Sequence, residues 1–127
     1  MTALNILHVD DEDDIREVAA YALALDPDIV LTSVASGQAA LAALDEGLRP
    51  DVVLLDVMMP NLDGPGTLVR IREQPALENT PVIFMTARAR SGEIDQYRAL
   101  GALDVVIKPF DPMTLAADVR AILAAGQ

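Results

Sequence analysis

Cysteine and tryptophan are absent from this chain of 127 residues, and aromatic residues make up only 3% of it. The absence of cysteine excludes disulfide bonds and thiolate metal sites. Apolar residues nevertheless form 52% of the sequence. The core must therefore be aliphatic, built from Val, Ile, Leu and Ala, and the length suits one compact domain.

Basic residues are scarce, because nine Lys and Arg stand against 20 Asp and Glu, for a formal net charge of −11. Such a surface repels phosphate backbones and anionic lipids, so neither a nucleic-acid nor a membrane partner is expected. The first residues lack the basic cluster of a signal peptide, and no apolar run reaches the ~18 residues that span a bilayer. We expect a soluble, cytoplasmic protein with a single domain, residues 1–127.

Five short apolar runs, rich in β-branched residues, alternate with longer amphipathic stretches. Each run is bounded by polar residues, Gly or Pro. Continuous apolarity favours strands that are covered on both faces of a parallel sheet. The predicted strands are Leu4–Val9, Ile29–Ser33, Val52–Leu55, Val82–Met85 and Val105–Ile107.

The stretches between these strands have the apolar spacing of helices. Their apolar stripes are Ile15, Val18, Ala19, Ala22 and Leu23; Leu41 and Leu44, after a start near Ser36; Leu68 and Ile71; Ile94, Tyr97 and Leu100; and Leu115, Val119, Ile122 and Leu123. Asp111 is predicted to cap the last helix, with Pro112 at its first position. The order (βα)₅ predicts an α/β fold with a doubly wound parallel sheet and helices on both faces.

Polar residues follow four of the predicted strands, at the edge where such sheets bind their ligands. Asp10 and Asp11 follow the first strand, Asp56 the third, Thr86 the fourth and Lys108 the fifth. Three converging carboxylates about 5 Å apart repel by roughly 3 kcal/mol per pair at an effective dielectric near 20. A divalent cation offsets this repulsion, and Mg²⁺ suits a site with few protein ligands.

Lys108 is the only lysine, although arginine occurs eight times. Its ammonium is a compact charge suited to an anion beside a carboxylate. With a cation and the Thr86 hydroxyl, the site has what phosphoryl transfer needs, since that reaction depends on positioning and charge neutralisation. Asp56 is the candidate nucleophile, because it ends a strand predicted to be central.

Five motifs stand in order along nearly the whole chain. They are Val9-Asp10-Asp11-Glu12, Leu54-Leu55-Asp56-Val57-Met58-Met59-Pro60, Leu62-Asp63-Gly64, Met85-Thr86-Ala87 and Lys108-Pro109-Phe110. Together they resemble the receiver domain of two-component response regulators. The resemblance implies a flavodoxin-like sheet with the strand order 2-1-3-4-5, as in the stand-alone chemotaxis receivers.

The resemblance also assigns a metal site. Asp11, Asp56 and the backbone carbonyl of Met58 would hold Mg²⁺, or Mn²⁺ as an alternative, and Asp10 would act through a bound water. Asp56 would be the phosphoacceptor in a Mg²⁺-dependent reaction. All of these ligands are oxygen atoms, as hard cations prefer.

Further residues would bind the phosphoryl group. Lys108 and Thr86 would contact its oxygens, and the amides of Met58 and Ala87 would complete the cradle. The family usually has Tyr or Phe three residues before the lysine, coupled to the threonine as a switch. Here that position is Val105, so the usual switch is missing its aromatic partner.

The expected function is that of a single-domain response regulator without an output domain. The phosphodonor would be a sensor histidine kinase or a phosphotransfer protein. Signalling would pass through an unidentified downstream protein, by binding or by onward phosphorelay. Such a domain is not an enzyme toward other substrates and catalyses only its own phosphorylation and dephosphorylation.

Three other functions compete with this one. An aspartyl phosphatase needs a second acid two residues after the nucleophile, where this chain has Met58. A flavin or nucleotide carrier needs a Gly- or Ser-rich loop after the first strand, where residues 10–14 are all acidic. A receiver-like scaffold that takes no phosphate is left open by Val105. His8, inside the first strand, is expected to be packed and neutral.

Overall fold

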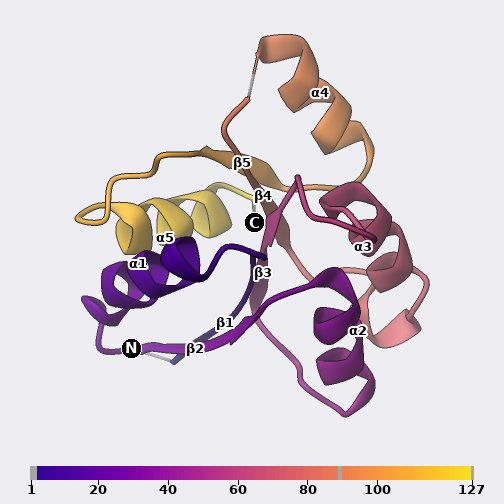
Figure 1. Cartoon of the computed structure of the whole chain (residues 1–127), viewed down its shortest axis with the longest axis horizontal. Helices are drawn as coiled ribbons and strands as arrows, with labels where there is room; N and C mark the ends of the chain where they lie inside the picture. The colour runs from indigo at the N-terminus through magenta and orange to yellow at the C-terminus, as the bar shows by residue number, and fades with distance from the viewer. Residues whose placement is uncertain (1–2, 89, 127) are drawn as a thin grey trace.

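The computed structural model describes residues 3–88 and 90–126, in which strands and helices alternate (Figure 1). The strands are β1 (Leu4–Val9), β2 (Ile29–Val34), β3 (Val52–Asp56), β4 (Val82–Thr86) and β5 (Asp104–Ile107). The helices are α1 (Asp13–Ala24), α2 (Gly37–Asp45), α3 (Gly64–Arg72), α4 (Ser91–Ala99) and α5 (Leu115–Ala125), with a 3-10 helix η1 (Pro75–Leu77) before β4. The predicted strands are confirmed to within one residue at either end.

The strands form one parallel sheet in the order β2-β1-β3-β4-β5, which confirms the predicted topology. In this register Val9 of β1 lies between Val34 of β2 and Leu55 of β3. The second strand in the chain, β2, pairs with one edge of β1, and the third, β3, pairs with the opposite edge of β1. The carboxyl ends of β1 and β3 therefore border the point where the winding reverses, which is where doubly wound sheets bind ligands.

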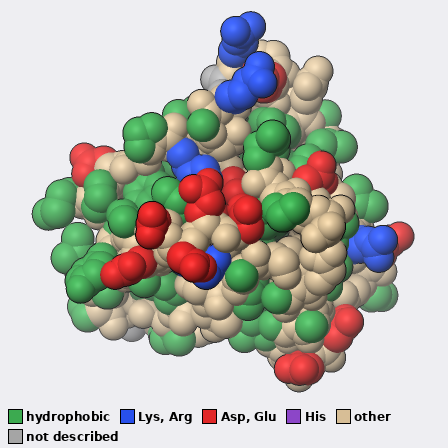
Figure 2. All heavy atoms as spheres, viewed as in Figure 1, with side chains coloured by type: hydrophobic (Ala, Val, Ile, Leu, Met, Phe, Trp, Pro, Cys, Tyr) green, Lys and Arg blue, Asp and Glu red, His purple; other side chains and the backbone are tan. Residues whose placement is uncertain are grey.

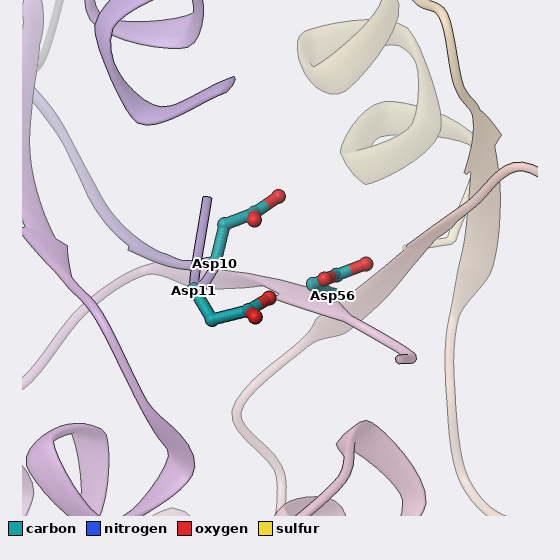
Figure 3. Close-up of side chains that lie close together, drawn as sticks. All are labelled: Asp10, Asp11 and Asp56. Carbon is teal, nitrogen blue, oxygen red and sulfur yellow. The ribbon is translucent and has the colours of Figure 1, made fainter. Parts of the chain in front are cut away.

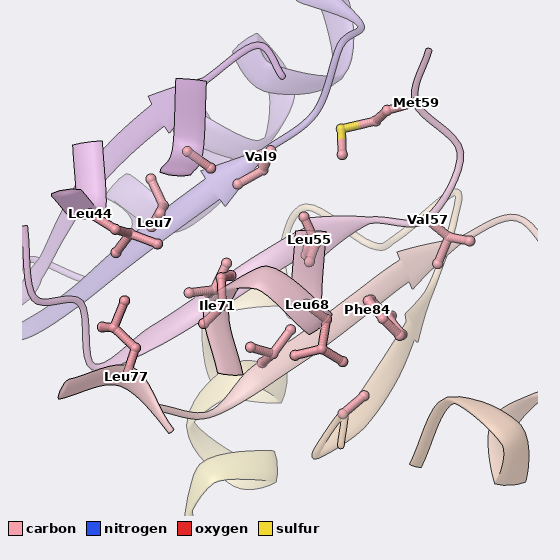
Figure 4. Packing of buried hydrophobic residues seen from close by; sticks show 14 residues of the cluster. Leu7, Val9, Leu44, Leu55, Val57, Met59, Leu68, Ile71, Leu77 and Phe84 are labelled. Atoms are coloured by element: carbon pink, nitrogen blue, oxygen red, sulfur yellow. The ribbon is translucent and has the colours of Figure 1, made fainter. Parts of the chain in front are cut away.

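Helices cover both faces of this sheet, with α1 and α5 on one side and α2, α3 and α4 on the other (Figure 1). Successive strand residues point to opposite faces, so Leu7 and Val9 enter one core while Ile6 enters the other. Figure 4 shows the core on the α2 and α3 side, where Leu55 and Phe84 meet Leu68. Because both faces are covered, the strands read as continuous apolar runs.

Helix α4 is the element whose packing differs most from the sequence pattern. None of its residues is fully buried, and Leu100, predicted on its apolar stripe, follows the helix and is 46% exposed. The helix contacts the core through Tyr97, whose ring meets Phe84 edge-on at a centroid distance of 5.1 Å. In α1, Val18 is likewise exposed, because the apolar stripe is wider than the surface that β2 and α5 cover.

The helices are nine to twelve residues long, and two have side-chain caps. Helix α2 starts beside Ser36 as predicted, and Ser36 caps it by accepting the Ala39 N–H at 3.0 Å. Asp63 caps α3 by accepting the Gly66 N–H at 2.8 Å. The predicted start of α5 at Pro112 is wrong, because Asp111 first closes a turn by accepting the N–H of Met113. Within residues 3–88 and 90–126 no helix combines the length and apolarity needed to cross a membrane.

Candidate functional site

Three carboxylates meet at the carboxyl edge of the sheet, as the sequence predicted. Asp10 and Asp11 follow β1, and Asp56 is the last residue of β3. One oxygen atom from each lies within 4.8 Å of the others (Figure 3). Asp10 and Asp56 are buried, whereas Asp11 is exposed. Acidic side chains also gather near the middle of the face seen in Figure 2.

Lys108 reaches this acidic cluster from the end of β5. Its ammonium nitrogen Nζ lies 3.0 Å from Asp56 Oδ1 and 3.2 Å from Asp10 Oδ2. Its backbone N–H donates to the carbonyl of Thr86 at 2.8 Å, which ties the end of β5 to that of β4. Only 13% of its side chain is exposed, so water screens the two ion pairs weakly.

The charges and burial of these groups shift their pKa values. Burial, followed by the charges of Asp10 and Asp11, raises the pKa of the Asp56 carboxyl, although the hydrogen bond from Lys108 opposes this. Burial by itself lowers the pKa of Lys108, but the two carboxylates outweigh it and the pKa is raised. Lys108 is therefore a cation at neutral pH and acts as the internal counter-ion of the cluster.

Replacing Asp56 with asparagine is expected to stabilise the fold at neutral pH, because the amide removes a buried charge from beside two other acids. The pKa of the Asp56 carboxyl is raised in the folded state, so this group contributes stability below its ordinary pKa of 3.8. That contribution is lost as pH rises through the raised pKa of the folded state. The difference between Asp56→Asn and wild type should thus be largest at neutral pH and vanish in acid. Urea unfolding across this pH range without divalent cations measures it, and equal stabilities at neutral pH would contradict the argument.

Thr86 ends β4, and its hydroxyl is engaged with the segment that leads to α4. The oxygen Oγ1 donates to the Arg88 carbonyl at 3.2 Å and accepts the Arg88 N–H at 3.1 Å. Val105, the predicted switch position, pairs with Phe84 in the sheet and is partly buried. Tyr97 of α4 contacts the same Phe84 through its ring, so the sheet neighbour of Val105 is itself part of an aromatic pair.

The segment between β3 and α3 is held by a close backbone approach. A Cβ atom on Gly64 would lie 2.6 Å from the Asp56 carbonyl oxygen and 2.8 Å from the Val57 Cα. The Gly64 N–H donates to the Val57 carbonyl at 2.9 Å. Pro65 lies in the first turn of α3, where its missing N–H leaves no helical bond unmade. Met58, predicted to contribute its backbone, exposes 76% of its surface.

Two residues at the site were not singled out from the sequence. Gly64 belongs to the Leu62-Asp63-Gly64 motif, but the motif does not predict its close approach to the Asp56 backbone; the local signal is the Asp that precedes it as a helix cap. Arg16 is not among the predicted site residues, yet its guanidinium donates to the Asp10 carbonyl at 2.7 Å. A sequence feature that could have indicated Arg16 is its position in the first turn of α1, directly after the acidic residues that follow β1.

The sheet order is that of flavodoxin-like α/β folds, and the acidic edge lies where such sheets bind ligands. The model of the response regulator receiver domain matches residues 6–120, and the chain belongs to this family. Receiver domains are the signalling domains of two-component systems. They bind Mg²⁺ or Mn²⁺ at an acidic pocket, and the carboxylate cluster has the oxygen donors that such ions require.

Relatives and solved structures of several kinds resemble the chain. The transcriptional regulatory protein CseB of Streptomyces avermitilis is 41% identical over 94% of this chain and 48% of its own length. The chemotaxis response regulator CheY4 of Vibrio cholerae has a TM-score of 0.86 at 30% identity, covering 95% of this chain and 99% of that chain. The Mn²⁺-bound form of the response regulator Rcp1 has a TM-score of 0.77 at 25% identity, covering 95% and 92%. The chain spans about half the length of the curated relatives CseB and ycf27.

Proposed function

We propose that Asp56 accepts a phosphoryl group from a phosphohistidine in a Mg²⁺-dependent reaction. The observation that carries this proposal is the buried Asp56 carboxylate, 3.0 Å from the Lys108 ammonium and beside two further acids. In the transfer an O–P bond forms at Asp56 while the P–N bond of the donor breaks, and its electron pair returns to the imidazole nitrogen. Receiver domains are phosphorylated by histidine kinases, so the donor is a sensor histidine kinase or a phosphotransfer protein.

The proposed metal ligands are Asp11, Asp56 and the backbone carbonyl of Met58, with Asp10 acting through a water molecule. The bound ion would neutralise charge on the carboxylates and on the phosphoryl oxygens. Mn²⁺ is an alternative, because carboxylate and carbonyl oxygens suit both ions. The support for this assignment is the convergence of the three carboxylates at one edge.

The proposed phosphoryl contacts are Lys108, Thr86 and the backbone amides of Met58 and Ala87. The Thr86 hydroxyl has a single proton, which it donates to the Arg88 carbonyl. Donation to a phosphoryl oxygen would require that bond to be given up, so the segment from Thr86 into α4 is expected to respond. Helix α4 has no fully buried residue, and a change in this segment therefore meets little resistance.

The output of the domain would be binding of a downstream protein or transfer of the phosphoryl group onward. Val105 offers no ring to report the change from β5, so we place the response in the segment that follows Thr86. Toward other substrates the domain would have no activity. It would catalyse only its own phosphorylation and dephosphorylation.

Intact-protein mass after incubation with acetyl phosphate and Mg²⁺ tests the phosphorylation proposal. We expect a gain of about 80 Da, the mass of one phosphoryl group, in the wild-type chain. The gain should be absent without Mg²⁺ and absent in Asp56→Asn, because the amide is not a nucleophile.

The matched control is Asp95→Asn, which makes the same chemical change at an exposed position on α4. This variant should gain the same mass as wild type. If the wild-type chain gains no mass with acetyl phosphate and none with a panel of histidine kinases, the proposal is rejected in favour of a scaffold that takes no phosphate.

A further inference from the structure

The two acids after β1 are held in very different ways. Asp10 is fixed at several points: its N–H donates to the Val34 carbonyl, Oδ1 accepts the Glu12 N–H at 2.9 Å, and Oδ2 pairs with Lys108. Asp11 is exposed, and no hydrogen bond or ion pair within the described residues holds its carboxylate. The position of the Asp11 side chain therefore depends on the backbone that carries it.

The peptide bond between Asp10 and Asp11 is fixed by Arg16. The guanidinium nitrogen Nη1 donates to the Asp10 carbonyl oxygen at 2.7 Å. That oxygen belongs to the peptide group whose nitrogen is the backbone nitrogen of Asp11. Rotation of this peptide plane would swing the Asp11 side chain, so the hydrogen bond from Arg16 sets its direction.

Arg16 is itself rigidly placed. Its backbone N–H donates to the Glu12 carbonyl at 3.1 Å and so belongs to the first turn of α1. The second guanidinium nitrogen, Nη2, pairs with Asp13 on the same turn, and 21% of the side chain is exposed. A planar guanidinium can bind two acceptors at once in a set geometry, which a lysine cannot reproduce.

We propose that Arg16 is a positioning residue that orients Asp11 for the divalent cation. This inference rests on the proposed Mg²⁺ site and adds a residue outside the ligand set. Groups that orient metal ligands typically change affinity by about 10–100-fold when they are replaced. The charge of Arg16 acts in the opposite direction, because a nearby cation repels Mg²⁺.

These opposite signs allow the two roles of Arg16 to be separated. If Arg16 orients Asp11, Arg16→Gln should weaken Mg²⁺ binding by about 10-fold, and Arg16→Lys should weaken it as well although the charge is kept. If only its charge mattered, Arg16→Gln would bind Mg²⁺ more tightly and Arg16→Lys would match wild type. The matched control is Arg70→Gln, which removes the same charge at an exposed position in the last turn of α3.

The measurement is the Mg²⁺ dissociation constant from amide shifts in an NMR titration, with far-UV circular dichroism as a check on folding. At saturating Mg²⁺ the rate of phosphorylation of Arg16→Gln by acetyl phosphate should return to the wild-type rate. Should Arg16→Gln fail to fold, Arg16→Lys still separates the two roles, because it keeps the positive charge and loses the guanidinium that binds two acceptors.

The outcomes distinguish this inference from the proposed function. Suppose that the wild-type chain binds Mg²⁺, that Asp11→Asn weakens this binding, and that the Arg16 variants keep the wild-type affinity. This result overturns only the positioning role of Arg16 and leaves the proposed metal site standing. Absence of Mg²⁺ binding in the wild-type chain overturns the metal part of the proposed function and this inference with it. Weaker binding in both Arg16 variants, with Arg70→Gln unchanged, supports the positioning role.

Discussion

Replacing Lys108 with methionine is expected to lower the free energy of unfolding at neutral pH by about 3–5 kcal/mol, the usual cost of leaving buried charges without their partner. The ammonium is 3.0 Å from Asp56 and 3.2 Å from Asp10, and both acids are buried. Methionine fills a similar volume without the charge, so the loss reports electrostatics rather than a cavity. Urea unfolding without divalent cations measures the effect.

The pH dependence of the Lys108→Met variant has a definite sign. The hydrogen bond from Lys108 lowers the pKa of Asp56, so its removal raises that pKa further above the ordinary value of 3.8. A raised carboxyl pKa destabilises the fold as pH rises. The loss of unfolding free energy in Lys108→Met should therefore shrink as pH falls and Asp56 becomes protonated. Added Mg²⁺ should restore more stability to this variant than to wild type, because the ion replaces the missing counter-charge.

Two further variants control this prediction. Lys108→Arg keeps a cation and should lose less stability than Lys108→Met. The double variant Lys108→Met/Asp56→Asn removes one of the unpaired acids and should recover part of the loss, which a double-mutant cycle quantifies. A deficit in Lys108→Met that is independent of pH would show that packing, not charge, is the role of Lys108.

Replacing Gly64 with alanine is expected to destabilise the fold by about 3 kcal/mol, the upper part of the usual range for overpacking. The added Cβ would lie 2.6 Å from the Asp56 carbonyl oxygen and 2.8 Å from the Val57 Cα. Both are backbone atoms, so no side chain can rotate away and the start of α3 must move. Because this contact includes the backbone of Asp56, phosphorylation by acetyl phosphate should slow as well.

The matched control for Gly64 is Gly92 in the first turn of α4. A Cβ on Gly92 meets no atom within 4 Å, so alanine there is expected to be neutral or to stabilise the fold by about 0.4–1 kcal/mol. Chemical denaturation of both variants, with mass spectrometry of the acetyl phosphate reaction, gives the comparison. Equal stability of Gly64→Ala and wild type would contradict the close approach of α3 to β3.

Much of the fold followed from local pattern. The five apolar runs predicted the strands, because a strand that is buried on both faces has apolar residues at consecutive positions instead of alternating with polar ones. Ser36 marked the start of α2 because a serine side chain accepts a free N–H of the first turn. The apolar stripes predicted burial for Leu100 and Val18, but both are exposed. An apolar stripe indicates which face of a helix is hydrophobic, but not how much of that face a neighbouring element covers.

The candidate site was predicted from strand ends, and the roles of its residues remain predictions. Parallel strands end at a common edge, so Asp10, Asp56 and Lys108 were expected to converge although Lys108 is 98 residues from Asp10. Arg16 escaped sequence reasoning because its contact is with a carbonyl oxygen, and every residue offers one of those. The proximity of Gly64 to Asp56 likewise depends on how α3 enters the sheet.

The sequence by itself determined the order of the elements, the aliphatic core and the chemical groups at the strand ends, because these depend on residue type and spacing. Only the tertiary structure decided which of the neighbouring acids is buried: Asp10 is enclosed beside Lys108, whereas Asp11 is exposed. It also decided that Arg16 holds the peptide between them. The physical reason is that burial and hydrogen-bond partners depend on the packing of distant segments, which local spacing does not encode.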